Sequence, residues 1–196
     1  SFCGKMKKII FIFILLFGFT SIVKAETKRI TSGNPNAKIT IIAYESLTCS
    51  HCANFHKDVY PLLKKDYIDT GLAKIEFRHF PLDIAAFNAS KISQCKYDQS
   101  LEILEKLYSD QQSWIKGKDI DEVNQNLKNF LKKAGFEINF EECINNKNIE
   151  DFVLNDRIEG TKKFNVNATP TIIINNKKFE KSLNYKNLKK SLEKLI

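Results

Sequence analysis

Apolar runs at three places in the chain predict the strands of a sheet. Residues 38–44 read Lys-Ile-Thr-Ile-Ile-Ala-Tyr, residues 73–80 read Ala-Lys-Ile-Glu-Phe-Arg-His-Phe, and residues 171–175 read Thr-Ile-Ile-Ile-Asn. The first run is nearly continuous, as in strands that are buried on both faces. A further short strand is expected at residues 178–180, after a tight turn at Asn175-Asn176.

Longer stretches with helical periodicity alternate with these strands. Pro61 should kink or shorten the first helix, and Gly135 should stop the fourth. The predicted helices cover residues 49–67, 83–96, 99–109, 120–134, 140–146, 148–164 and 185–196. The resulting order is strand, helix, strand, a helical block, helix, strand, strand, helix. This order predicts an α/β fold.

The N-terminus has the form of a secretory signal. Two lysines precede an almost wholly apolar stretch at residues 9–19, and Val23-Lys24-Ala25 fits the usual cleavage positions. We expect residues 6–25 to be removed, with residues 1–5 upstream of the true start at Met6. The apolar stretch is short for a membrane span, and no cysteine at the cleavage region offers a lipid anchor. An uncleaved N-terminal anchor is the alternative.

Composition is consistent with a single exported domain. The formal charge of +8 falls to +4 without residues 1–25, because 27 basic residues then face 23 acidic ones. Residues 26–196 are enough for one core with an insertion. The lysine pairs are spread over helix faces, and no basic stripe carries interleaved aromatic side chains. Binding to nucleic acid is therefore not expected.

The most informative motif is Cys49-Ser50-His51-Cys52, directly after the first predicted strand. A strand that leads into a helix opening with Cys-x-x-Cys is typical of a thiol-disulfide site. At the helix N-terminus, free backbone N–H groups and the helix dipole favour the thiolate of Cys49, which we expect to be the attacking sulfur. Cys52 lies one turn later and is turned toward apolar neighbours. We expect it to be the resolving sulfur, which closes the disulfide with Cys49. His51 can add positive charge or a hydrogen bond beside Cys49.

Other interpretations of the motif stay open. A zinc knuckle needs a second close cysteine pair, which the sequence lacks. A purely structural bridge is the second alternative, and a copper carrier that uses histidines as well is the third. We expect no metal site and no cofactor. Of the other candidates, His56 is expected at the surface, His79 as a satisfied structural side chain and Trp114 at a packed helix junction.

The processed chain keeps four cysteines, and besides Cys49 and Cys52 these are Cys95 and Cys143. Each follows an apolar residue by one helical turn, so both are expected on apolar helix faces. The even count and an oxidising compartment favour a structural disulfide between them. Two buried free thiols are the alternative.

The chain resembles the DsbA family of thioredoxin-fold thiol-disulfide oxidoreductases. The resemblance rests on residues 44–56, 77–82 and 164–171, which together extend over nearly the whole mature chain. It implies a thioredoxin fold with a helical insertion at about residues 84–148, acting in the periplasm. It also implies that Pro170 is cis and faces the active site, with Thr169 tuning the disulfide and pairing with extended substrates.

The chain departs from the family pattern at several positions. Many relatives have an acidic residue six positions before the first cysteine, where this chain has Ala43, whereas Glu45 lies four positions before it. Proton transfer at Cys52 is therefore open to Glu45, to water or to another group. Ala168 replaces the usual Gly, and Ser50-His51 replaces the Pro-His of the best-known members.

These observations favour an exported oxidase that passes a Cys49–Cys52 disulfide to reduced, unfolded exported proteins. The resemblance implies reoxidation by a quinone-linked, DsbB-like membrane partner. We expect a monomer, and we expect no separate dimerisation domain before residue 38, which an isomerase or reductase usually needs. A disulfide isomerase or reductase is one alternative, and a client-binding holdase with incidental thiols is another.

Overall fold

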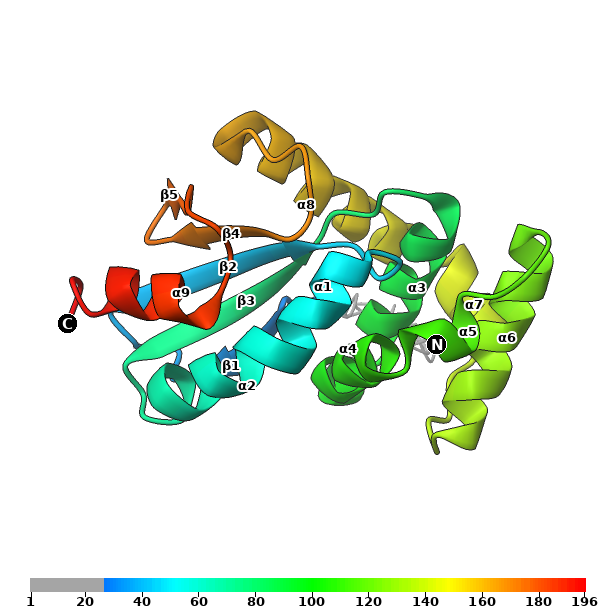
Figure 1. The fold of residues 1–196 in the computed structure, drawn as a ribbon. Coiled ribbons are helices and arrows are strands. Elements are labelled where there is room, and N and C mark those ends of the chain that lie inside the picture. Colours follow the sequence, from blue (N-terminus) through cyan, green and yellow to red (C-terminus); the bar gives the residue numbers. More distant parts are fainter. Residues whose placement is uncertain (1–26) are drawn as a thin grey trace, which may run out of the picture.

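The computed structural model describes residues 27–196, and the predicted signal sequence lies outside them. Within these residues, the centre is a five-stranded sheet with the order β1-β3-β2-β4-β5 (Figure 1). β2 and β3 are parallel, and the other neighbouring pairs are antiparallel. The strands are β1 (Ile30–Gly33), β2 (Ile39–Glu45), β3 (Ala73–His79), β4 (Thr171–Ile174) and β5 (Lys177–Lys178). This mixed sheet is the predicted α/β fold.

One long helix follows β2 and begins at the Cys-x-x-Cys motif. It starts as α1 (Ser50–Asn54) and continues through a π-helical segment, η1 (Phe55–Val59). It then forms α2 (Tyr60–Leu63) and a second π-helical segment, η2 (Lys64–Ile68). Pro61 has no N–H group, so regular α-helical hydrogen bonding cannot run through it. The predicted helix is confirmed in position, and the disturbance expected at Pro61 takes the form of wider turns.

Helices between β3 and α8 lie together at one end of the sheet, to the right in Figure 1. We call this block, α3 to α7, the helical insertion. Its helices are α3 (Ile84–Cys95), α4 (Ser100–Ser109), α5 (Gln111–Trp114), α6 (Ile120–Lys133) and α7 (Phe140–Asn145), with a 3₁₀ turn at Tyr97–Gln99. The chain then returns through α8 (Lys147–Phe164) and ends in α9 (Tyr185–Leu192). None of the helices in residues 27–196 has the length and apolar character that crossing a lipid bilayer requires.

The two faces of the sheet bury different sets of side chains, because alternate residues of β2 point to opposite sides. Ile41 and Ala43 belong to the core shared with the long helix that follows β2, which we call the active-site helix because it begins at the Cys-x-x-Cys motif, and with α9 and the insertion. Ile42 and Tyr44 pack on the other face with residues at the end of α8. There α8 comes so close that a Cβ atom on Gly160 would lie 2.8 Å from Cε1 of Tyr44. The sheet is thus covered on both faces, as the apolar run in β2 indicated.

The sequence prediction was wrong at the short elements. β1 was missed, because only Ile30 of its four residues is buried and the others are polar or glycine. The last helix ends at Leu192, four residues before the predicted end. The turn at Asn175 and Asn176 is confirmed: both residues have positive φ, the backbone that a two-residue hairpin turn requires.

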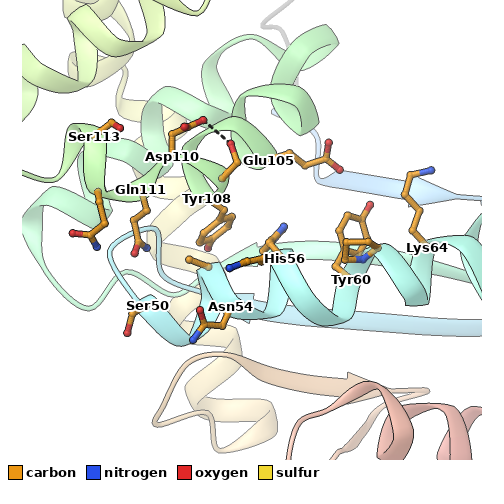
Figure 2. A pocket seen from close by; sticks show the side chains of 15 residues that line it. Ser50, Asn54, His56, Tyr60, Lys64, Glu105, Tyr108, Asp110, Gln111 and Ser113 are labelled. Atoms are coloured by element: carbon orange, nitrogen blue, oxygen red, sulfur yellow. Dashed lines mark hydrogen bonds between the residues drawn. The ribbon is translucent and has the colours of Figure 1, made fainter.

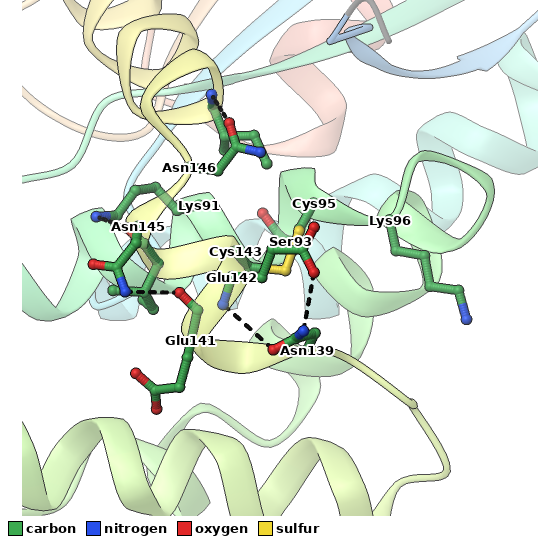
Figure 3. The surroundings of a disulfide bond; sticks show 12 residues. Lys91, Ser93, Cys95, Lys96, Asn139, Glu141, Glu142, Cys143, Asn145 and Asn146 are labelled. Carbon is green, nitrogen blue, oxygen red and sulfur yellow. Dashed lines mark hydrogen bonds between the residues drawn. A yellow bond between two sulfur atoms is a disulfide. The ribbon is translucent and has the colours of Figure 1, made fainter. Parts of the chain in front are cut away.

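A disulfide joins Cys95 at the end of α3 to Cys143 in α7 (Figure 3). The two Cα atoms lie 5.6 Å apart, and 48 positions separate the residues in the sequence. On the chain-entropy argument, a loop of this length stabilises the fold by about 4 kcal/mol. The bridge therefore fastens the first and last helices of the insertion to each other.

Candidate redox site

The Cys-x-x-Cys motif lies where β2 leads into the long helix. Cys49 has extended backbone dihedral angles and is the N-cap of α1, and its carbonyl oxygen accepts the N–H groups of Cys52 and Ala53. Both motif cysteines are free thiols. Cys49 is half-buried, whereas the side chain of Cys52 is fully buried. A reagent in solution therefore reaches the first sulfur before the second.

The surroundings of Cys49 favour its thiolate. A hydrogen bond from the Cys52 thiol is the largest cause, and the Thr169 side chain and the backbone N–H groups of Cys52 and His51 act in the same direction. Together they outweigh the effect of burial and lower the pKa of Cys49 to about 5. This is the direction that free N–H groups at a helix N-terminus produce. At neutral pH the sulfur of Cys49 is ionised.

Cys52 has the opposite character. Burial raises the pKa of the Cys52 thiol far above its ordinary value, and its hydrogen bond to Cys49 and the nearby charge of Glu45 add to this effect. A proton on Cys52 therefore accompanies a negative charge on Cys49. The reduced pair holds one thiolate and one thiol, and the thiol stabilises the thiolate.

The loop before β4 completes the site. The peptide bond between Thr169 and Pro170 is cis, and Cys49, in its protonated form, donates to the carbonyl oxygen of Thr169 over 3.4 Å. Oγ1 of Thr169 is buried without a hydrogen-bond partner of its own, so it is free to donate to the sulfur when Cys49 ionises. A cavity of about 480 Å³ opens beside this loop, with His51, Pro170 and Leu183 in its lining.

The two residues between the cysteines are exposed. Residue 51 acts on Cys49 through its backbone N–H. Ser50 borders a larger cavity of about 820 Å³, which lies between the active-site helix and α4 and α5 of the insertion (Figure 2). The motif thus has a cavity on each side, one next to the cis-proline loop and one next to the insertion.

The expectation of a surface position for His56 was wrong. Its side chain is only 6% exposed, and Nε2 lies 2.9 and 3.1 Å from the two carboxylate oxygens of Glu45. The ring stacks on Tyr108, with centroids 4.1 Å apart. His56 follows Cys52 by four positions, and residues at this spacing share one helix face. The expected burial of Cys52 therefore indicated that the His56 side chain is buried as well.

Glu45, one of the groups considered for proton transfer at Cys52, lies next to His56. It is 3% exposed at the end of β2, and together with burial its negative charge raises the pKa of Tyr108. A carboxylate this deeply buried needs a partner such as His56. The structure thus brings Glu45, His56 and Tyr108 together next to Cys52.

His79 and Trp114 have the structural positions that the sequence predicted. His79 is 3% exposed, and its Nε2 lies 3.1 Å from Oε1 of Gln94. Trp114 is fully buried, and its indole N–H donates to the carbonyl oxygen of Leu107 over 2.9 Å. In residues 27–196, no group of three or more histidine, cysteine, aspartate or glutamate residues could hold a metal ion.

A half-buried acidic thiol, a buried partner thiol and a neighbouring cis-proline loop on this sheet define a thioredoxin-like redox protein. A family model described as thioredoxin matches residues 25–194. Disulfide bond formation protein D of Bacillus subtilis is 27% identical over 173 residues, which are 83% of this chain and 74% of that protein. A putative protein-disulfide oxidoreductase of Rickettsia bellii is 36% identical over 75 residues, 38% of this chain and 29% of that protein.

Among solved structures, the crystal structure of Wolbachia pipientis alpha-DsbA1 is similar to this chain, with a TM-score of 0.76 and 30% sequence identity. The match covers 86% of this chain and 90% of that one. The chain therefore belongs to the thioredoxin-like family and, within it, to the DsbA-type protein-disulfide oxidoreductases.

Proposed function

We propose that this chain is an exported dithiol oxidase that introduces disulfide bonds into reduced proteins through Cys49 and Cys52. The observation that carries the proposal is the contrast between the two sulfurs. Cys49 is half-buried and acidic, whereas Cys52 is fully buried and holds its proton. Stabilising the thiolate stabilises the reduced form, and a stable reduced form makes the disulfide a strong oxidant.

The proposed reaction begins with a substrate thiolate that attacks the Cys49 sulfur of the enzyme disulfide. The bond between Cys49 and Cys52 breaks, a mixed disulfide forms at Cys49, and the Cys52 sulfur leaves with the electron pair and takes up a proton. A second substrate thiolate then attacks the substrate sulfur of the mixed disulfide. Cys49 departs as a thiolate, which its low pKa makes easy. The substrate has lost two electrons, and the enzyme dithiol has gained them.

We propose that substrates bind as extended chains at the cis-proline loop. The backbone of Thr169 can pair with an extended segment, as in recognition by strand addition. The cavity beside it is lined by Phe55, Val59 and Leu183 as well as His51 and Pro170. Its mixed apolar and polar lining suits a segment of an unfolded protein, which exposes both kinds of side chain.

Export, cellular partner and domain limits belong to the same proposal. The predicted signal supports a periplasmic protein that is cleaved near Ala25, with residues 26–196 as the mature domain and an insertion at about residues 84–148. We propose that a quinone-linked, DsbB-like membrane oxidase restores the disulfide, and that the mature protein is a monomer. The disulfide between Cys95 and Cys143 supports an oxidising compartment.

A redox titration of residues 26–196 in glutathione buffers tests the proposal, together with oxidation of reduced, unfolded ribonuclease A. We expect a midpoint more oxidising than about −200 mV and rapid oxidation of the ribonuclease. A midpoint potential of about −270 mV, as for thioredoxin, would instead favour a reductase. A cysteine pair that stays inert while the protein prevents aggregation would favour a holdase. Either result would contradict the oxidase assignment.

A further inference from the structure

A glutamine of the helical insertion reaches the redox motif. Gln111 is the first residue of α5, a single helical turn, and it is only 4% exposed. Figure 2 shows its side chain directed toward the segment that leads into α1. Buried amides need partners for their N–H groups, so the partners of this side chain indicate why it is there.

The Gln111 amide nitrogen donates two hydrogen bonds to the turn at residues 47–49, which we call the active-site turn. It donates to the carbonyl oxygen of Leu47 over 2.9 Å and to that of Cys49 over 3.1 Å. Leu47 is itself 1% exposed, and the N–H of Cys49 is hydrogen-bonded to the carbonyl oxygen of Ser46. A single side chain from the insertion therefore holds the turn at two points, one of them in the attacking cysteine.

The carbonyl group of Cys49 also belongs to the first turn of the active-site helix. It accepts the N–H groups of Cys52 at 3.1 Å and Ala53 at 3.2 Å. A residue at this position often supports the first turn with its own side chain, but Cys49 makes no such capping hydrogen bond. The external amide of Gln111 therefore adds a support that the motif itself does not supply.

The base of Gln111 is fixed within the insertion. Trp114, three positions later in α5, is fully buried and bonded to the Leu107 carbonyl in α4. The N–H of Ile115 is bonded to the carbonyl oxygen of Gln111 itself. Because the backbone that follows Gln111 is held in α5, the Gln111 amide has little freedom to move away from the turn.

We infer that Gln111 is a positioning residue of the redox reaction, by which the helical insertion fixes the turn that aims backbone N–H groups at the Cys49 sulfur. This inference rests on the proposed function of Cys49. If the turn loosens, the N–H groups of His51 and Cys52 no longer hold a constant place, and their support for the thiolate weakens. Gln111 touches no reacting atom, so it acts through geometry alone.

The test compares Gln111→Met with Gln112→Met. Methionine keeps roughly the length and volume of glutamine but has no N–H group, and Gln112 is the exposed neighbour in the same helix. For Gln111→Met we expect the pKa of Cys49 to rise by about one unit. At a pH below the pKa this is a tenfold loss of thiolate. The equilibrium with glutathione should move by a similar factor toward the disulfide, whereas Gln112→Met should match the wild type.

A purely structural role for Gln111 would lower the melting temperature without moving either titration, and that result would overturn the inference. If Gln111→Met does not fold, Gln111→Asn serves instead: it keeps the amide but is one methylene too short to reach both carbonyls. An unchanged Cys49 titration in folded Gln111→Asn would count equally against it. The wild-type measurements separate the two claims, because an inert wild-type pair refutes the proposed function, whereas an active wild type with an unaffected variant refutes only the role of Gln111.

Discussion

Replacing Cys49 with serine is expected to abolish oxidation of reduced proteins. The serine hydroxyl cannot form a disulfide, so the variant has no Cys49–Cys52 bond for a substrate thiolate to attack, and the remaining Cys52 is fully buried. We expect the rate with reduced ribonuclease A to fall by roughly a thousandfold or more, as when a covalent nucleophile is lost. The measurement is the rate of disulfide formation at equal concentrations of folded protein.

The second cysteine pair provides the matched control for Cys49→Ser. A variant with Cys95→Ala and Cys143→Ala also loses a disulfide, but that disulfide lies within the insertion. It should be less stable and still oxidise the substrate at a temperature where it is folded. Oxidation by Cys49→Ser at the wild-type rate would show that another group carries the reaction.

Replacing Cys52 is expected to arrest the reaction at the mixed disulfide. Without a resolving thiol, Cys49 that has attacked glutathione disulfide or an oxidised protein stays bound to it. Both Cys52→Ser and Cys52→Ala should therefore accumulate mixed disulfides, which gel electrophoresis without reductant or mass spectrometry detects. In the wild type the corresponding species should be present only transiently.

The same two variants separate resolution from thiolate stabilisation. The hydrogen bond from Cys52 is the largest cause that lowers the pKa of Cys49. Serine retains a donor at this position and alanine does not, so the pKa of Cys49 should rise more in Cys52→Ala than in Cys52→Ser. Equal pKa values in the two variants would contradict the hydrogen-bond account, even if both accumulate mixed disulfides.

The sequence predicted the main elements because each has a strong local pattern. The buried run in β2, the paired asparagines before β5 and the spacing of the two cysteines act over a few residues, and such signals survive in any fold that contains them. β1 lacked a signal of this kind. It forms because the edge of β3 offers hydrogen-bonding groups to a short polar segment, and this depends on residues more than 40 positions away.

The parts of the site that the sequence did not predict are contacts between distant segments. Gln111 lies 62 positions after Cys49, and a glutamine in a polar connection looks like an ordinary surface residue. The spacing of His56 from Cys52 was the one local sign that its side chain is buried, and the partners that satisfy and cover it there, Glu45 and Tyr108, come from other segments. In each case a tertiary partner decides whether a polar side chain is buried, and local sequence does not name that partner.

The central claim is that the fold makes Cys49 acidic, and a pH titration of the reduced protein tests it most directly. Thiolate absorbance in the ultraviolet, checked by the pH dependence of alkylation at Cys49, reports the ionised fraction. The structure predicts a transition with a pKa of about 5, so that Cys49 is ionised throughout the neutral range while Cys52 stays protonated. A transition near the ordinary pKa of a free cysteine, above 8, would contradict the account.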